Sequence, residues 1–273
     1  MDKIKQKAIE QIIDASIKTF ADVFSSKHTS QVCNPEGIIN AKKNNCFISK
    51  LGHEFMFYGA FVRSFDSSFG KVLEKIGNAI AKLSYEVKDA LEAFLLPQQS
   101  QHIDFMISEY EKNVKPSIAD YNNFECMRAQ DIRSYKKAHP TDHYFYSQEK
   151  DEHYLIELKA GGDLDNKKAK SEKQALLQEY FILKNLLGTQ NNQPKIFIFL
   201  GTAYNMFGEG NYWKQDRVRQ FFASEELLIG KDYWNFVCDD VYGFDIVMKQ
   251  YDKSVIYIKK SLEKIKDIYF MDV

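Results

Sequence analysis

Two acids and a lysine lie where a predicted β-hairpin would bring them together. Asp142 precedes an aromatic run that favours a strand, and Glu157 and Lys159 end the next extended run. Because side chains alternate along a strand, Glu157 and Lys159 share one face while Leu158 points into the core. Carboxylates suit a hard divalent cation such as Mg²⁺, and an ammonium group can orient or help to deprotonate an attacking water. The pattern therefore predicts a site for metal-assisted attack on a phosphodiester.

Elements that follow the hairpin would hold this site in place. The pair Gly161-Gly162 predicts a tight turn, after which Asp163 or Asp165 caps a long helix. A largely apolar run at residues 195–200 predicts a buried strand, and the strand–helix–strand order places it parallel to the second hairpin strand. The expected fold class is therefore α/β: a mixed β-sheet flanked by helices, with a helical N-terminal part and a C-terminal helix.

Further helices are predicted from apolar residues at helical spacing. They cover residues 2–24, a second helix between a break at 64–70 and Pro97, a third at 102–113, and a C-terminal helix at 252–269. The second helix would include Val87 and Leu91 in its apolar stripe, and it carries Glu74 beside small residues. Glu74 is either a solvated surface acid or an acid that points into a cleft, where it would reach the cation through a water.

Lysines crowd the first two turns of the helix after the glycine pair, at Lys167, Lys168, Lys170 and Lys173. Positive charge at a helix N-terminus opposes the helix dipole, and a bound polyanion such as DNA would offset that cost. A solvated lysine face is the alternative interpretation. Further contacts to phosphates or bases are predicted in the loop and short helix that follow the buried strand, from Asn205, Lys214, Arg217 and Arg219.

The composition indicates a folded protein whose binding surface for polyanions is local. The chain has 273 residues, of which 44% are hydrophobic, so it can bury a sizeable core. Its formal charge of -1 excludes the large basic excess of many nucleic-acid binders. We expect one domain over residues 1–273, with a helical part at roughly 1–115 and a catalytic core at roughly 120–245.

The sequence indicates no membrane span, signal peptide, zinc site or disulfide framework. No apolar stretch is long enough to span a membrane and the N-terminus lacks the apolar segment of a signal peptide, so we expect a soluble, cytoplasmic protein. The four cysteines are scattered without a CxxC pair, which predicts neither a zinc site nor a disulfide framework. His143 and His153 lie beside the hairpin, and we expect them at the strand surface or near DNA, not as metal ligands.

An acid, a gap across a hairpin and a Glu-x-Lys element together match the PD-(D/E)XK nuclease arrangement. Longer blocks resemble one family of such nucleases, the Type II restriction endonucleases of the TdeIII/MjaII type. The blocks lie at residues 63–74, 156–173, 204–210 and 226–238, and they spread over most of the region from about 50 to 245. Several of the similar residues therefore lie outside the predicted catalytic core.

The resemblance implies Mg²⁺-dependent cleavage of double-stranded DNA at a short palindrome of the GGNCC type. It also implies a cognate DNA methyltransferase that protects the host, and a palindromic target makes a homodimer the natural reader. Two other functions stay open. One is a PD-(D/E)XK repair or structure-specific nuclease, which would cut without discrete fragment sizes. The other is a catalytically silent DNA-binding protein of the same fold.

On the nuclease pattern, Asp142, Glu157 and the Leu158 carbonyl oxygen would hold Mg²⁺, with Glu74 as the additional acid. The chain departs from the pattern at the first acid, because a threonine separates Asp142 from the preceding proline. Asp131 is the alternative first acid, although it is less well placed at the start of a strand.

Overall fold

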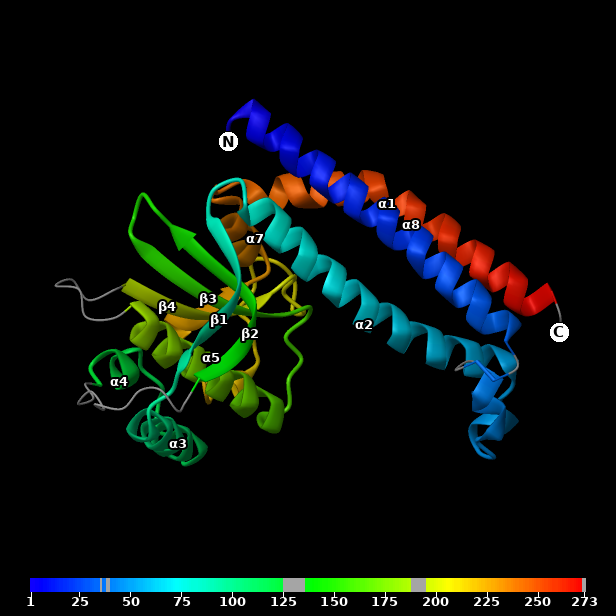
Figure 1. The fold of residues 1–273 in the computed structure, drawn as a ribbon. Coiled ribbons are helices and arrows are strands. Elements are labelled where there is room, and N and C mark those ends of the chain that lie inside the picture. Colours follow the sequence, from blue (N-terminus) through cyan, green and yellow to red (C-terminus); the bar gives the residue numbers. More distant parts are fainter. Residues whose placement is uncertain (35, 38–39, 125–135, 188–194, 272–273) are drawn as a thin grey trace. The chain divides into compact units, whose positions relative to one another are not determined.

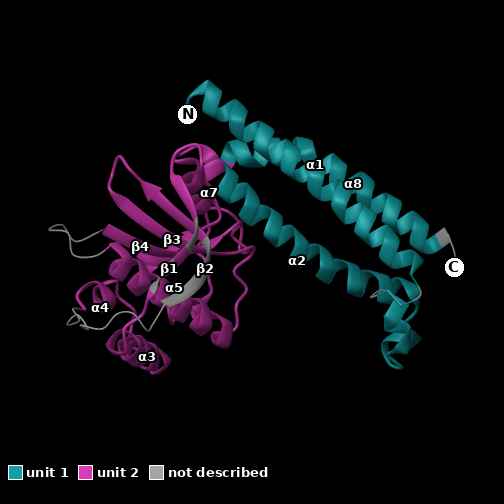
Figure 2. Ribbon diagram, viewed as in Figure 1, with its two compact units in different colours: residues 1–79, 245–273 teal, residues 80–244 magenta. Residues whose placement is uncertain are grey.

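The structure, a computed structural model, describes residues 1–34, 36–37, 40–124, 136–187 and 195–271 (Figure 1). For residues 89–90, 92–93, 136–142 and 271 it describes the backbone alone. The chain forms two compact units, one made of Met1–Ala79 with Asp245–Val273 and the other of Ile80–Phe244 (Figure 2). The single domain expected from the sequence stays a prediction.

The first unit is built from long helices joined by aromatic rings. They are α1 (Lys3–Cys33), most of α2 (His53–Ala81) and α8 (Gly243–Met271), with the short 3-10 helices η1 (Asn40–Asn44) and η2 (Ile48–Leu51) between α1 and α2. Phe24 of α1 packs edge-on against Phe61 and Phe65 of α2. The ring centres of Phe57 in α2 and Tyr269 in α8 are 4.6 Å apart. The predicted N-terminal and C-terminal helices are thus confirmed; α1 extends beyond its predicted C-terminal end, and α8 extends beyond both of its predicted ends.

The predicted break at residues 64–70 is wrong, because α2 continues through it. Phe57, Phe61, Phe65 and Phe69 recur every four residues, which places them along one side of a helix. Neighbouring rings in this row are stacked, with centres 5.3, 6.5 and 5.3 Å apart. This aromatic row outweighs the weaker helix propensity of the serines and glycine beside it.

The C-terminal half of the predicted second helix is also wrong. Helix α2 ends at Ala81, and the chain then forms strand β1 (Glu86–Phe94). Val87 and Leu91 pair with residues of the neighbouring strand, because a spacing of four places side chains on one face of a strand as well as of a helix. Pro97 begins α3 (Pro97–Glu111) instead of ending a helix.

Five strands of the second unit form a mixed sheet in the order β1-β2-β3-β4-β5. After β1 these are β2 (Lys136–Ser147), β3 (Glu152–Lys159), β4 (Lys195–Thr202) and β5 (Leu227–Ile229). Strand β2 pairs antiparallel with β1 and β3, while β4 lies parallel to β3 and β5. Helix α5 (Asn166–Leu187) lies between β3 and β4 in the chain. The predicted hairpin, parallel pair and α/β class are confirmed.

Helices cover both faces of this sheet (Figure 1). On one face, Leu155 of β3 shares a core with Phe181 of α5. On the other, the rings of Tyr154 and Phe199 pack against Phe236 of α7 (Lys231–Cys238). Helix α3 packs on α5, and the shorter elements are α4 (Ala119–Asn122), α6 (Asp216–Arg219) and η3 (Ser224–Glu226). Among the helices of the described ranges, none combines the length and apolar character needed to cross a membrane.

His143 and His153 are buried inside the second unit, so the expectation of surface positions is wrong. His143 Nε2 lies 2.9 Å from the Tyr233 hydroxyl oxygen, and His153 Nδ1 lies 2.9 Å from the Tyr144 hydroxyl oxygen. Each imidazole thus hydrogen-bonds to a tyrosine in the core.

Protonation of His153 is expected to destabilise the fold. Burial lowers the pKa of His153 below its ordinary value of 6.5, and the charge of Lys88 lowers it further. Because the unfolded chain then binds the proton more readily than the folded chain, the free energy of unfolding falls as the pH drops below 6.5. Urea unfolding at about pH 5.5 and about pH 7.5 should show a smaller pH dependence in His153→Gln than in the wild type. An equal pH dependence of the free energy of unfolding in both proteins would show that His153 does not cause the loss of stability at low pH.

Candidate active site

Glu157 and Lys159 lie at the end of β3, the central strand of the sheet. Glu157 pairs with Leu200 of β4, and Lys159 pairs with Thr202, the last residue of β4. Lys159 Nζ donates a hydrogen bond to Glu157 Oε1, and the two side chains are 29% and 16% exposed. The structure therefore brings the predicted acid and lysine together at a place that solvent reaches.

A third charged residue, Glu172 of α5, joins this cluster. Glu172 Oε1 lies 3.1 Å from Lys159 Nζ. The Glu-x-Lys element does not indicate Glu172, but helical spacing does. Glu172 comes three residues after Ala169 and four before Leu176, and both of these residues are buried. It therefore lies on the helix face that is turned toward the sheet. Two carboxylates thus share one ammonium group at the end of β3.

The Lys159 ammonium is stabilised in its charged form. Burial acts to lower the pKa of Lys159, but the carboxylates of Glu157 and Glu172 outweigh burial and raise it above its ordinary value. Two carboxylates against one ammonium leave an excess of negative charge among these three groups. Such an excess suits a divalent cation.

The turn after β3 requires glycine at two successive positions. Gly162 has a φ of +66°, and a Cβ atom there would lie 2.6 Å from Thr202 Cγ2. A Cβ atom on Gly161 would lie 2.3 Å from the Tyr204 hydroxyl oxygen. The turn therefore packs directly against the loop that follows β4, so this loop begins beside the Glu157 and Lys159 cluster.

Helix α5 begins shortly after this turn with a capped, basic first turn. Asp165 Oδ1 accepts a hydrogen bond from the Lys168 backbone N–H at 2.8 Å, so Asp165 is the cap among the two predicted candidates. The Lys167 and Lys168 side chains are exposed. Lys170 Nζ instead lies 2.7 Å from Glu111 Oε1 of α3. Lys167 and Lys168 therefore remain the candidates for phosphate contacts on this helix.

Lys173 does not fit the predicted DNA contact, because its side chain is 0% exposed. It forms an ion pair with Glu226, and its Nζ lies 5.2 Å from the centre of the Tyr121 ring. Burial lowers the pKa of Lys173, and the charge of Glu226 acts in the opposite direction. Lys173 comes four residues after the buried Ala169 and four before the buried Leu177, which is a core position on the helix.

Asn205 is also buried, and its side chain holds the loop after β4 instead of facing DNA. Its Oδ1 accepts a hydrogen bond from the Phe207 N–H at 3.0 Å, and its Nδ2 donates to the Asn211 carbonyl oxygen at 2.8 Å. The Glu209 carboxylate accepts the N–H groups of Asn205 at 2.7 Å and of Lys231 at 3.0 Å. The loop is thus fixed to itself and to the start of α7.

The basic residues around α6 fall into two groups. Lys214 and Arg217 have exposed side chains. The Arg219 guanidinium lies 4.3 Å from the centre of the Tyr212 ring, and its Nε donates to the Trp213 carbonyl oxygen at 3.0 Å. Arg219 is therefore held by its own loop, whereas Lys214 and Arg217 remain candidates for DNA contacts.

The first predicted acid is known from its backbone alone. Asp131 lies outside the described residues, and the Asp142 side chain is not described either. The Asp142 backbone belongs to β2, where the next residue, His143, pairs with Ile156 of β3. The described pairing of β2 with β3 thus begins one residue after Asp142, and the register of β2 against β1 shifts between Tyr144 and Pro140. The roles of Asp142 and Asp131 stay predictions.

Oxygen atoms near the end of β3 are of the kind that Mg²⁺ prefers. Glu157 and Glu172 supply carboxylates, and the predicted set adds the Leu158 carbonyl oxygen and Asp142. Glu74 belongs to the first compact unit, so its predicted role is untested. Within the described ranges, no three Asp, Glu, His or Cys side chains form a group that could hold a metal ion.

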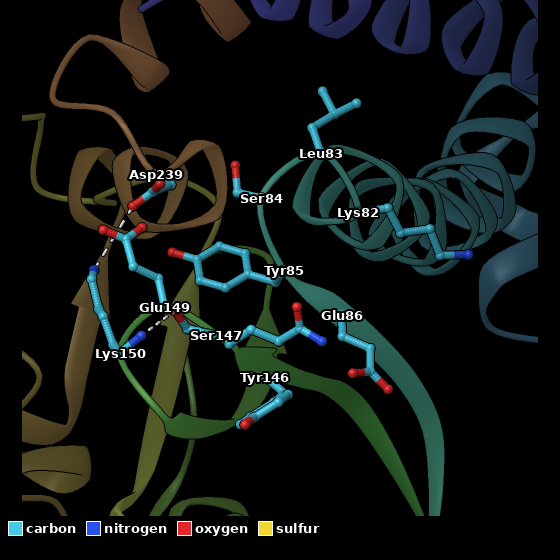
Figure 3. A pocket seen from close by; sticks show the side chains of 11 residues that line it. Lys82, Leu83, Ser84, Tyr85, Glu86, Tyr146, Ser147, Glu149, Lys150 and Asp239 are labelled. Carbon is cyan, nitrogen blue, oxygen red and sulfur yellow. Dashed lines mark hydrogen bonds and ion pairs between the residues drawn. The ribbon is translucent and has the colours of Figure 1, made fainter.

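A cavity of about 660 Å³ lies at the opposite end of the β2–β3 hairpin (Figure 3). Its lining includes lysines and acids in mixture: Lys82, Glu86, Glu149, Lys150 and Asp239. Lys150 Nζ lies 3.9 Å from Asp239 Oδ1. Because the lysines are balanced by acids, the cavity offers no basic surface to DNA. The candidate active site is therefore the Glu157 end of β3.

A family model described as Type II restriction endonuclease, HinfI, matches residues 5–255 of the chain. The match covers well over half of the chain and includes Glu157, Lys159 and Glu172. No curated protein and no solved structure matches the chain.

Proposed function

The chain belongs to the HinfI family of Type II restriction endonucleases, and on this premise we propose that it cleaves double-stranded DNA with Mg²⁺ held at Glu157. The observation that carries the proposal is the cluster of Glu157, Lys159 and Glu172 at the solvent-accessible end of β3. The exposed Lys167 and Lys168 follow in the first turn of α5. A proposed metal ligand, an ammonium group and proposed phosphate-binding cations thus come from one short stretch of chain, and these are groups that phosphodiester hydrolysis can use.

We assign the protein ligands of Mg²⁺ to the Asp142 and Glu157 carboxylates and the Leu158 carbonyl oxygen, all in the second unit, while the role of Glu74 as an additional acid stays a prediction. Mg²⁺ prefers such oxygen ligands and keeps several waters. When bound, it would stabilise negative charge on the attacked phosphate and on the departing 3′-oxygen. Support for this assignment is that the chain carries Asp142 and Glu157 on adjacent strands, β2 and β3, with the pairing of the two strands beginning at His143.

Lys159 supplies positive charge beside the reacting phosphate. Its ammonium is held by carboxylates from two elements, β3 and α5. An ammonium held in this way can donate a hydrogen bond to the attacking water or to a phosphate oxygen, and it stabilises negative charge as the charge develops. We therefore assign Lys159 an orienting role.

The DNA-binding surface is local, because the whole chain has a formal charge of only -1. We propose that phosphate contacts come from exposed cations of α5 and of the α6 region: Lys167, Lys168, Lys214 and Arg217. Lys170 and Arg219 would first have to leave Glu111 and the Tyr212 ring. Each phosphate contact releases a counterion, so duplex binding should weaken steeply with salt.

A short palindromic site and a homodimer accompany this proposal, since a two-fold target suits a two-fold reader. The GGNCC-like sequence rests on the TdeIII/MjaII resemblance alone. It should therefore be tested first, followed by other short palindromes. A cognate DNA methyltransferase would protect the host DNA, and both enzymes would act in the cytoplasm.

Digestion of a sequenced plasmid tests the proposed function. With Mg²⁺ we expect discrete fragments whose ends map to one short palindrome, and after chelation with EDTA we expect no cleavage, because Glu157 acts through the cation. Cleavage without discrete fragment sizes would favour a structure-specific repair nuclease. Duplex binding without any cleavage would favour a silent DNA-binding protein. Either result would overturn the proposal.

A further inference from the structure

We propose that Glu172 is a positioning residue for Lys159, which keeps the ammonium group at the site when the Glu157 carboxylate turns to the cation. The inference rests on the proposed function and adds a residue outside the Glu-x-Lys element. It starts from the two carboxylates that share Lys159, one on its own strand and one on α5.

Lys159 and the proposed Mg²⁺ compete for the Glu157 carboxylate. In the structure it accepts a hydrogen bond from Lys159, and in the proposed enzyme it binds Mg²⁺. An oxygen atom that binds a divalent cation is a weaker acceptor for an ammonium group, and the two positive charges repel each other. Lys159 therefore needs a second anion to stay beside the phosphate once the cation is present.

Glu172 supplies this second anion from a different element. The 3.1 Å between its Oε1 and Lys159 Nζ is within the range of an ion pair, and its side chain is 22% exposed. Solvent therefore screens this contact less than it screens an ion pair on the open surface. Because Glu172 belongs to α5, the contact does not depend on the position of the Glu157 side chain on β3.

Packing of α5 fixes the backbone from which Glu172 projects. Ala169 and Leu176, about one turn to either side, are both buried. The adjacent Lys173 is paired with Glu226 in the core. A functional side chain on a packed helix is held more accurately than one on a loop, which is what a positioning residue requires.

Single-turnover cleavage and calorimetric Mg²⁺ titration with a bound duplex test this role together. We expect Glu172→Ala to slow cleavage about 10- to 100-fold while Mg²⁺ affinity and duplex affinity stay unchanged. Glu172→Gln should recover part of the rate, because it keeps an oxygen acceptor. In a Lys159→Met background, Glu172→Ala should cause no further loss, because its effect acts through Lys159.

Asp104→Ala is the matched control and should keep the wild-type cleavage rate, because it removes an exposed carboxylate that accepts a hydrogen bond from Gln174 of the same helix at 3.2 Å. A wild-type cleavage rate in Glu172→Ala would overturn the inference and leave the proposed function standing. Weaker Mg²⁺ binding in Glu172→Ala would make Glu172 a cation ligand instead. A further loss in the Lys159→Met background would make its role structural. If the wild type cleaves no DNA, the proposed function itself fails.

Discussion

Glu157→Gln and Lys159→Met are each expected to slow DNA cleavage by about 10³-fold or more. Glu157→Gln removes the charge that would hold Mg²⁺ and keeps the size of the side chain. Lys159→Met removes the ammonium group and keeps an apolar stem. Both groups would act on charge that develops in the transition state, so their loss should affect the cleavage rate more than duplex affinity. Single-turnover cleavage and gel-shift assays measure the two quantities.

The other end of β3 provides a matched control for these variants. Glu152 Oε1 lies 3.7 Å from Lys195 Nζ, and this ion pair joins the same two strands, β3 and β4, at the end away from the site. Glu152→Gln and Lys195→Met should therefore leave the cleavage rate unchanged. Full activity in both Glu157→Gln and Lys159→Met would remove this end of β3 from the catalytic site.

Glu226→Ala is expected to lower the free energy of unfolding of the second unit by about 3–5 kcal/mol. Glu226 is 1% exposed. Its carboxylate accepts hydrogen bonds from Lys173 Nζ, from the Tyr121 hydroxyl at 2.8 Å and from the Ala223 N–H at 2.7 Å. The variant leaves a buried ammonium group without this counter-charge. In a chain of this size the unfolding midpoint should fall by about 10 °C, which thermal unfolding measures.

A second variant separates the ion pair from the loss of packing. Lys173→Met combined with Glu226→Ala should be more stable than Glu226→Ala alone, because no unpaired charge is then buried. Glu111→Ala, from the exposed pair with Lys170, should cost less than about 1 kcal/mol. Wild-type stability in Glu226→Ala would mean that the buried pair does not support the fold.

The hairpin and the acid–lysine pair can be predicted from the sequence because their signals are local. An aromatic run, a polar turn and a second extended run define two adjacent strands. Glu157 and Lys159 are two residues apart on one strand, so alternation alone puts them on the same face. Their hydrogen bond therefore needs no knowledge of tertiary packing.

Strand β1 could not be predicted in the same way. The spacing of Val87 and Leu91 fits a helix or a strand equally well. The choice is made by pairing with β2, whose residues lie far along the chain. The continuity of α2 could not be predicted for a similar reason. Contacts within a row of phenylalanine rings override the local turn signal at residues 64–70.

The charged residues of α5 show that a basic sequence pattern does not by itself predict which lysines are exposed. Lys167 and Lys168 are exposed as a basic pattern suggests, but Lys173 occupies a core position and pairs with Glu226, 53 residues away. No local pattern reveals that partner. Glu172 likewise joins the site because its helix face meets β3, which follows from helical periodicity and not from any motif.

Calorimetric titration of Mg²⁺ into duplex-bound protein, with the duplex alone as baseline, tests most directly whether Glu157 holds the cation. The Lys159→Met variant keeps both carboxylates of the cluster and should not cleave, so it permits binding to be measured without turnover. We expect saturable Mg²⁺ binding in Lys159→Met and loss of that binding when Glu157→Gln is added. Equal Mg²⁺ binding with and without Glu157→Gln would contradict a cation site at the end of β3.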